Sequence, residues 1–197
     1  MPVRVIYLVR HGQYESYPEN GDSLGGSLTP LGHEQSERAA DALSQMPISA
    51  IHTSTLRRAA ETAGVIALRF PSIIVQPSRE LWEIIPAIPP READYFALHF
   101  PNLTLEAILR DRKVADAAFD RLFRPGETED EHEVVVCHGN LIRYYVCRVL
   151  EVPPEIWGNM ETNNCGITRC TIESDGRKML ISMNDVGHLL PAMRTFT

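Results

Sequence analysis

Two histidines, each followed by glycine, stand where the sequence predicts strand ends. Arg10-His11-Gly12 follows the apolar run Val3–Val9, and His138-Gly139 follows the apolar run Val134–Cys137. The carboxyl ends of strands in an open α/β sheet line the ligand crevice, so both histidines are expected at one edge of the sheet. A single histidine at a strand end is usually structural, whereas two with the same neighbour favour a functional site.

A third segment brings cations to the same crevice. Arg57 and Arg58 lie in the predicted first turn of a helix. A cation there is repelled by the positive end of the helix dipole, and an anion bound beside it offsets this repulsion. Arg57 is interpreted as a solvent-facing residue, which leaves Arg58 for an anion. Glu80 and Glu83 follow the third predicted strand, and a carboxyl group there can protonate a leaving oxygen.

Together these residue types predict phosphoryl transfer through a covalent histidine. A neutral imidazole at His11 can attack phosphorus, while Arg10 and Arg58 bind the non-bridging oxygens and stabilise their charge. His138 adds a hydrogen-bond donor, and Glu83 protonates the leaving oxygen and then activates water. No spacing of Asp, Glu, His or Cys suggests a metal site, and no cofactor is expected.

The composition restricts the class of partner. The 197 residues carry 19 Lys+Arg against 26 Asp+Glu, a formal net charge of -7, and 44% hydrophobic residues. Such an acidic chain, whose cations are nearly all arginine, lacks the basic stripe that nucleic acid requires but can bind one small anion. No stretch approaches the ~20 apolar residues that cross a bilayer, so no membrane partner is expected. The run Val3–Val9 is too short for a signal peptide, which predicts a cytoplasmic location.

The elements that position these residues alternate between strands and helices, which predicts one α/β domain over residues 1–197 with a largely parallel sheet. Thr29 and either Thr53 or Ser54 are the expected caps of the first two helices. Strands are predicted at residues 3–9, 50–52, 73–75, 134–137, 167–172 and 179–183, and helices at residues 29–45, 55–68, 105–122 and 141–150.

Three connecting segments have distinct compositions. Residues 16–28 carry turn residues and are expected to form a loop. Residues 84 to about 103 are rich in proline and are interpreted as a lid or docking insertion, with packing against the core as the equal alternative. The acidic run Glu127–Glu133 is most simply a solvated loop.

The motifs, in their order along the chain, resemble the histidine phosphatase superfamily, the phosphoglycerate mutase-like proteins. Arg10-His11-Gly12 is similar to the signature of that family, and the supporting motifs follow in the order Leu28–Gln35, Ser54–Thr62, Glu83 and His138-Gly139. The resemblance implies a three-layer phosphoglycerate mutase-like α/β fold, with a mostly parallel central sheet and helices on both faces.

The same resemblance implies a role for each matching residue. His11 corresponds to the phosphorylated nucleophile, and Arg10, Arg58 and His138 correspond to the phosphate pocket. Glu83 corresponds to the proton donor, although Glu80, three residues away, is an open alternative. The implied enzyme is a phosphoric monoester hydrolase that needs no metal.

Further segments resemble a subgroup of that family with protein Ser/Thr phosphatase activity in mitochondria. The resemblance places Gln13, Asn140, Asn163 and Asn164 at the rim of the pocket, although an Asn-Asn pair in a turn is also an ordinary turn sequence. Members of the subgroup carry a membrane anchor and an oligomerising segment ahead of the catalytic domain; neither is expected here, and the family suggests a homodimer. The matching segments are Arg10–Tyr14, Cys137–Tyr144, Asn163–Thr168 and Asn184–His188.

Three functions are compatible with these residues. A phosphatase that acts on phosphoproteins or small phosphomonoesters is favoured. A cofactor-dependent phosphoglycerate mutase is the first alternative, but the insertion offers only Arg91 as a cation for a second phosphate. A non-catalytic phosphopeptide-binding protein is the least favoured, because every residue that the chemistry needs is present.

Overall fold

A mixed β-sheet forms the centre of the structure. The computed structural model describes residues 2–16 and 24–196, so residues 17–23 of the predicted loop lie outside the described residues. Across these ranges the sheet has six strands in the order β3-β2-β4-β1-β5-β6. The strands are β1 (Arg4–Arg10), β2 (Ala50–Ser54), β3 (Val75–Ser78), β4 (Glu131–Cys137), β5 (Ile167–Ile172) and β6 (Lys178–Asp185).

The sheet is parallel over most of its width. β1 pairs in parallel with β4, β4 with β2, and β2 with β3. β5 pairs antiparallel with the other side of β1, and β6 pairs antiparallel with β5. The predicted, mostly parallel sheet is therefore confirmed, and the last two strands add an antiparallel edge to it.

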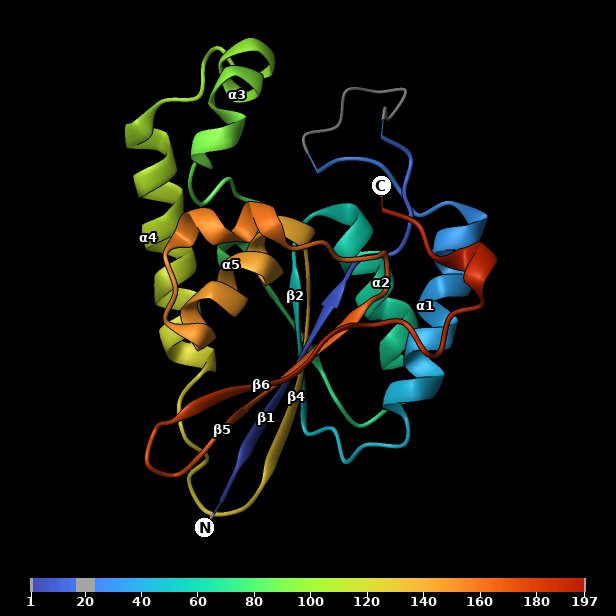
Figure 1. The fold of residues 1–197 in the computed structure, drawn as a ribbon. Helices are drawn as coiled ribbons and strands as arrows, with labels where there is room; N and C mark the ends of the chain where they lie inside the picture. The colour runs from blue at the N-terminus through green and yellow to red at the C-terminus, as the bar shows by residue number, and fades with distance from the viewer. Residues whose placement is uncertain (1, 17–23, 197) are drawn as a thin grey trace.

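Helices cover both faces of the sheet and give the three layers that the family resemblance implies (Figure 1). Val5, Tyr7 and Val9 of β1 pack toward α1 and α2, whereas Ile6 and Leu8 pack toward α4 and α5. Because both faces are covered, every residue of β1 is buried. The helices are α1 (Pro30–Leu43), α2 (Arg57–Ala67), α3 (Ala93–His99), α4 (Leu105–Leu122) and α5 (Gly139–Leu150).

Three predicted boundaries next to the site are wrong; one of them is the start of α5, which lies at Gly139 rather than at residue 141. β2 continues to Ser54, and α2 begins at Arg57 rather than at Thr55, with Leu56 as a cap residue that makes no side-chain bond. The Ser54 hydroxyl accepts a hydrogen bond from the Leu56 amide at 3.2 Å instead. The third strand is likewise shifted, to Val75–Ser78. β2 pairs with β4 on one side and β3 on the other, and this pairing extends β2 and β3 beyond their apolar residues.

The acidic run at Glu127–Glu133 is only partly a loop, because β4 begins at Glu131. Arg4, 3% exposed at the start of β1, explains the difference. Its guanidinium pairs with Glu131 at 2.5 Å and with Glu133 at 2.6 Å, and Glu133 also accepts a hydrogen bond from His52 at 2.9 Å. The buried cation of β1 therefore draws two carboxylates of the run into the sheet.

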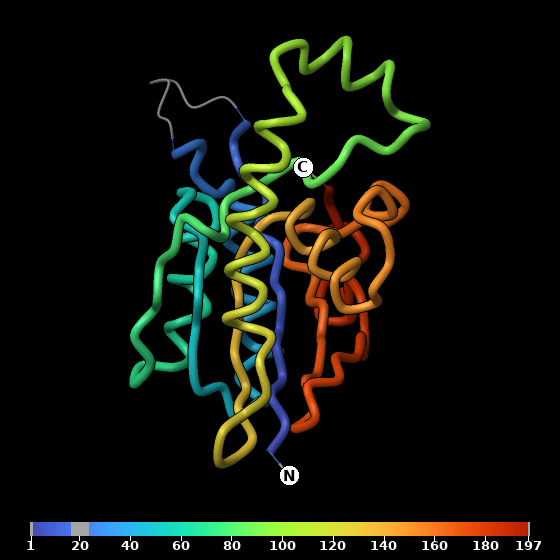
Figure 2. The backbone as a smooth tube through the Cα atoms, turned by 90° about the vertical axis from the view of Figure 1, so that its left-hand side faces the viewer, coloured from blue at the N-terminus to red at the C-terminus, as the bar shows by residue number. Residues whose placement is uncertain are grey.

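The segment 84–103 projects beyond the end of the sheet, and α4 descends from it along one face (Figure 2). Phe96 packs with Trp157 in a small apolar cluster, so part of the segment is core. Tyr95, Leu98 and Phe100 are 53%, 75% and 43% exposed, so another part faces solvent. Among the described helices, none is both long and apolar enough to span a membrane.

Candidate active site

The two histidines of the sequence motifs meet at the carboxyl ends of β1 and β4. Arg10 and Cys137 are register partners in this parallel pair, so the residues that follow them leave the sheet side by side. The ring centroids of His11 and His138 are 5.2 Å apart, and both side chains are buried. The predicted placement of both motifs at one edge of the sheet is therefore confirmed.

The hydrogen bonds of His11 fix which of its ring nitrogens carries the lone pair. Nδ1 lies 2.8 Å from the Gly12 carbonyl oxygen, which can only accept, so Nδ1 carries the proton. Nε2 is then the unprotonated nitrogen, and it accepts a hydrogen bond from Arg58 Nε at 3.0 Å. Burial first, and then the charges of Arg58 and Arg10, lower the pKa of His11 well below its ordinary value. The ring is therefore a neutral imidazole with a nucleophilic Nε2.

The turn after His11 lies against the start of α1. A Cβ atom on Gly12 would lie 2.5 Å from the Gly32 carbonyl oxygen, so only glycine allows this approach. Thr29 caps the helix by accepting a hydrogen bond from the Gly32 amide at 3.0 Å and donates to Gln13 Oε1 at 2.8 Å. Gln35 accepts from the Gln13 amide at 2.8 Å. Gln13, predicted at the rim, thus braces the turn that presents His11.

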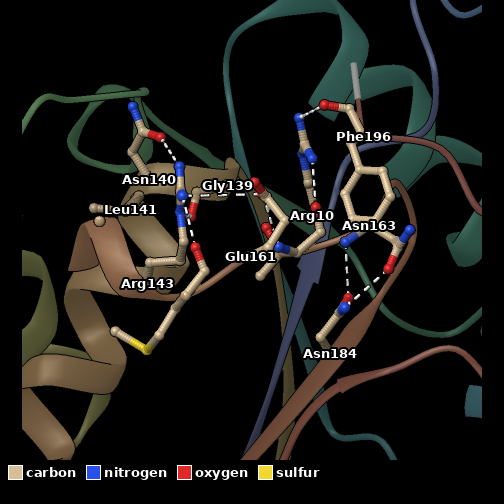
Figure 3. Close-up of polar contacts among 12 residues, drawn as sticks. Arg10, Gly139, Asn140, Leu141, Arg143, Glu161, Asn163, Asn184 and Phe196 are labelled. Atoms are coloured by element: carbon tan, nitrogen blue, oxygen red, sulfur yellow. Dashed lines mark hydrogen bonds and ion pairs between the residues drawn. The ribbon is translucent and has the colours of Figure 1, made fainter. Parts of the chain in front are cut away.

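Arg10 packs against the start of α5. Its Nη1 donates to the Thr162 carbonyl oxygen at 2.5 Å, and its Nη2 donates to the Phe196 carbonyl oxygen at 3.2 Å (Figure 3). A Cβ atom on Gly139 would lie 3.3 Å from Arg10 Nε, so the glycine after His138 leaves room for the guanidinium. Burial lowers the pKa of Arg10 from its ordinary value, but a guanidinium stays charged at any physiological pH.

Arg58 approaches the same pocket from the first turn of α2. Its guanidinium carbon lies 4.6 Å from the centroid of the Tyr14 ring, and the Tyr14 and His11 rings meet edge to face at 5.2 Å. Arg58 is partly buried while Arg57 is exposed, as the sequence predicts for the two neighbours. Tyr14 therefore positions the arginine over the nucleophilic nitrogen.

His138 uses only one of its ring nitrogens within the described residues. Nε2 lies 2.8 Å from the Ser54 hydroxyl oxygen, whereas Nδ1 is buried and has no hydrogen-bond partner in the described part of the chain. Burial and then His11 lower the pKa of His138 well below its ordinary value. A buried ring nitrogen without a partner costs free energy unless a ligand meets it, as expected in a binding pocket.

The structure separates the two glutamates that the sequence left as alternatives. Glu83 Oε1 accepts hydrogen bonds from the Asn140 and Leu141 amides at 3.1 Å and 3.3 Å, at the N-terminus of α5. Burial raises the pKa of Glu83, and the charges of nearby Arg10 and Arg58 offset this only in part.

Glu80 lies elsewhere, in an ion pair with Arg121 of α4 at 2.6 Å, and its side chain is 38% exposed. The structure therefore brings Glu83, and not Glu80, into the pocket. A carboxyl group with a raised pKa is the better proton donor of the two.

The other predicted rim residues are held by neighbours within the protein. Asn140 donates to the Ile84 carbonyl oxygen at 3.0 Å and accepts from Arg143 Nη2. Asn163 Oδ1 accepts from Asn184 Nδ2 at 2.9 Å, and the Asn163 amide donates to Asn184 Oδ1 at 2.8 Å (Figure 3). Asn140 thus lies beside the glutamate, while Asn163 braces the loop that leads into β5.

The contacts of several site residues were not predicted from the sequence. Tyr14 contacts the nucleophile and Arg58, and its signal was its place in the segment Arg10–Tyr14 that resembles the subgroup. Asn164, expected at the rim, is instead fully buried; it donates to the His11 carbonyl oxygen at 3.1 Å and accepts from the Thr195 hydroxyl at 2.8 Å. Ser54 was expected as a helix cap and instead contacts His138. The role of such polar residues depends on partners that are distant in the sequence, so it cannot be inferred from the local sequence alone.

Comparison with known proteins identifies the family. The model of the histidine phosphatase superfamily (branch 1) matches residues 6–85 and 98–185. A phosphoglycerate mutase of Plasmodium falciparum superposes with a TM-score of 0.62 at 25% identity, over 100% of this chain and 96% of that one. A phosphoserine phosphatase of Entamoeba histolytica superposes with a TM-score of 0.72 at 24% identity, over 95% of this chain and 100% of that one, which supports the fold.

Curated relatives belong to one group of serine/threonine-protein phosphatases. Pgam5 of Caenorhabditis elegans is 35% identical over 98% of this chain and 67% of its own length. Human PGAM5 is 32% identical over 95% of this chain and 64% of its own length. This chain therefore spans about two thirds of the length of these relatives. The predicted resemblance to phosphoglycerate mutase family member 5 is confirmed.

The predicted cytoplasmic location is wrong by the same comparison. The relatives from worm, mouse and human are all named as mitochondrial proteins, which points to mitochondria. The prediction rested on the lack of a leader before the first strand. A sequence that spans about two thirds of its relatives carries no information of that kind.

The family match, the relatives and the fold agree with the chemistry expected from the motifs. They support a phosphoric monoester hydrolase, as predicted. The chain belongs to the histidine phosphatase superfamily, branch 1.

Proposed function

We propose that this protein dephosphorylates phosphoserine and phosphothreonine in proteins through a phosphohistidine intermediate on His11. One observation carries the proposal: the bond from Nδ1 to the Gly12 carbonyl leaves a neutral Nε2 lone pair beside Arg58. Relatives named as serine/threonine-protein phosphatases match nearly the whole chain and support the substrate class.

The first half-reaction transfers the phosphoryl group to the enzyme. Nε2 of His11 attacks phosphorus, the bond to the serine or threonine oxygen breaks, and protonated Glu83 gives its proton to that oxygen. Arg58 releases Nε2 and turns its guanidinium to the phosphoryl oxygens. Arg10 and the unpaired nitrogen of His138 bind the remaining oxygens and stabilise their charge.

The second half-reaction returns the enzyme to its starting state. The Glu83 carboxylate, now unprotonated, takes a proton from a water molecule as that water attacks phosphorus. The bond between phosphorus and Nε2 of His11 breaks, the electron pair returns to the nitrogen, and orthophosphate leaves. Glu83 is protonated again, so one carboxyl group serves both steps.

The charges around the pocket favour a single phosphoryl group over a bisphosphate. Arg91, the one cation that the sequence offered in the insertion, donates to the Gly158 carbonyl oxygen at 2.5 Å and pairs with Glu92 at 3.3 Å. It is therefore engaged within the protein. This favours a phosphatase over a cofactor-dependent phosphoglycerate mutase.

We also propose that residues 1–197 act as one catalytic domain and that residues 84–103 shape its substrate entrance. The family suggests a homodimer, which analytical ultracentrifugation would test. The proposal does not depend on that assembly, because the groups assigned to chemistry come from this one chain.

Rapid quenching of the reaction tests the intermediate. With a ³²P-labelled phosphoserine peptide, wild type should form a phosphoenzyme that is labile in acid and stable in base, and His11→Ala should form none. His33→Ala is the matched control, because His33 is exposed on α1. The mechanism is contradicted if wild-type enzyme carries no ³²P after quenching, or if the His11→Ala enzyme still carries it. Conversion of 3-phosphoglycerate to 2-phosphoglycerate would indicate a mutase.

A further inference from the structure

A cavity of about 320 Å³ lies beside the candidate active site, under the insertion. Its apolar walls come from the insertion and from the segment after α5. Within the insertion, the rings of Phe96 and Phe100 lie 5.5 Å apart, and the Phe96 ring is 6.5 Å from that of Trp157. We name this cavity the aromatic groove; its apolar lining is Ile85, Tyr95, Phe96, Phe100, Trp157 and Met160.

The aromatic groove adjoins Glu83 through Asn140. Asn140 is part of its wall, and the Asn140 amide donates to Glu83 Oε1 at 3.1 Å. Because Glu83 is assigned to protonate the leaving oxygen, the leaving group must extend from the Glu83 side of the pocket. In a phosphoprotein that leaving group is the polypeptide, and the groove is the cavity beside it.

The charged groups of the groove are already paired. Arg143 donates from Nε to the Gly139 carbonyl oxygen at 3.3 Å, from Nη1 to the Met160 carbonyl oxygen at 2.8 Å, and from Nη2 to Asn140. Its guanidinium also lies 4.6 Å from the centroid of the Trp157 ring. All three guanidinium nitrogens of Arg143 therefore already donate within the protein, so Arg143 does not offer a pair of N–H groups to a second phosphate or an acidic side chain.

Each of the two carboxylates of the groove lies near an arginine. Glu161 lies 3.9 Å from Arg143 and is seen between Arg143 and Arg10 in Figure 3. Glu92 pairs with Arg91 at 3.3 Å. With its charges paired, the groove offers aromatic surface, and the exposed parts of Tyr95 and Phe100 gain free energy when an apolar group covers them.

From this arrangement we infer that the aromatic groove is a specificity subsite, and that its occupant is a large apolar side chain within three residues of the phosphorylated serine or threonine. The inference rests on the proposed function, since it needs a peptide as the leaving group. It assigns the exposed part of the insertion to substrate docking, while Phe96 belongs to the core.

A phosphopeptide series tests the subsite. Each peptide carries phosphoserine in an alanine background with a single leucine at one position from −3 to +3; an all-alanine peptide and free phosphoserine are the references. Wild type should hydrolyse the peptide with leucine at the preferred position with a kcat/KM about tenfold above that of the all-alanine peptide.

Two variants link that preference to the groove. Tyr95→Ala and Phe100→Ala should each reduce the leucine preference to within about twofold, and turnover of free phosphoserine should not change. Leu98→Ala is the matched control, because Leu98 lies on α3 with Tyr95, is 75% exposed and is not part of the groove. It should leave both activities as in wild type.

The outcomes separate the subsite from the proposed function. Equal turnover of all peptides by wild type, or a leucine preference that survives both groove variants, overturns the subsite while leaving the phosphatase intact. Loss of phosphoserine turnover in Phe100→Ala also overturns it, since the residue would then act on the chemistry. If wild type hydrolyses neither peptide nor phosphoserine above the His11→Ala background, the proposed function itself fails.

Discussion

Replacing Glu83 by glutamine tests the assignment of the proton donor. Glutamine keeps an oxygen that can accept from the Asn140 and Leu141 amides, which Glu83 Oε1 now does at 3.1 Å and 3.3 Å. It is also neutral, like the protonated acid that the first step needs. The substitution therefore preserves the N-terminus of α5 and the charge of the pocket, and it removes only the transferable proton.

The expected loss follows from general acid catalysis. For a phosphoserine peptide, whose alkoxide leaving group requires a proton, kcat/KM should fall about 10²–10⁴-fold. That loss corresponds to about 3–5 kcal/mol of transition-state stabilisation. For p-nitrophenyl phosphate the leaving phenolate needs no proton, so formation of the phosphoenzyme should slow by no more than about tenfold. The variant would then stall at the second step, because it also lacks the base that activates water.

Stopped-flow absorbance with p-nitrophenyl phosphate measures both consequences. Glu83→Gln should release a burst of p-nitrophenolate of about one equivalent per site, followed by a slow steady state. Glu80→Gln is the control, because Glu80 pairs with Arg121 and is 38% exposed; it should behave as wild type. A large loss in Glu80→Gln, or a Glu83→Gln enzyme that keeps full activity on the peptide, refutes the reasoning.

Two further predictions concern ionisation and packing. The kcat/KM for a phosphopeptide should rise with pH as His11 loses its proton, at a pKa below that of an ordinary histidine. It should fall again as Glu83 ionises, at a pKa above that of an ordinary glutamate; an alkaline limb that persists unchanged in Glu83→Gln would contradict this. Gly12→Ala places a Cβ atom 2.5 Å from the Gly32 carbonyl oxygen and should reduce the free energy of unfolding by about 1–3 kcal/mol in urea titrations. Gly64→Ala, in α2 with open space around it, should instead stabilise by about 0.5–1 kcal/mol; equal effects of the two would refute the packing argument.

The positions of the main site residues followed from the sequence because they depend on local chain geometry. Arg10, His11 and His138 come directly at or after buried strands, and the parallel pairing of those strands brings them to one edge. Arg58 follows from the start of a helix after β2. These inferences need only strand ends and helix starts, which apolar runs and short motifs mark well.

Other features depended on contacts between distant segments. Which of Glu83 and Glu80 lies in the pocket depends on Arg121, which lies far along the chain and pairs with Glu80. The end of the acidic run, from Glu131 to Glu133, is strand, and Arg4 of the neighbouring strand pairs with both glutamates. The contact of Asn164 with the His11 backbone could not be inferred, because a buried amide looks like any turn residue until its partners are known.

The place of β1 in the sheet has a consequence for how the chain is made. β1 precedes the other strands of the described sheet along the chain, yet its two neighbours, β4 and β5, begin only at Glu131 and Ile167. During translation an apolar strand with both hydrogen-bonding edges open must therefore wait until those two strands have been made, which makes it a candidate for self-association and for chaperone binding. The strand that presents the nucleophile is also the strand that the nascent chain must protect for longest.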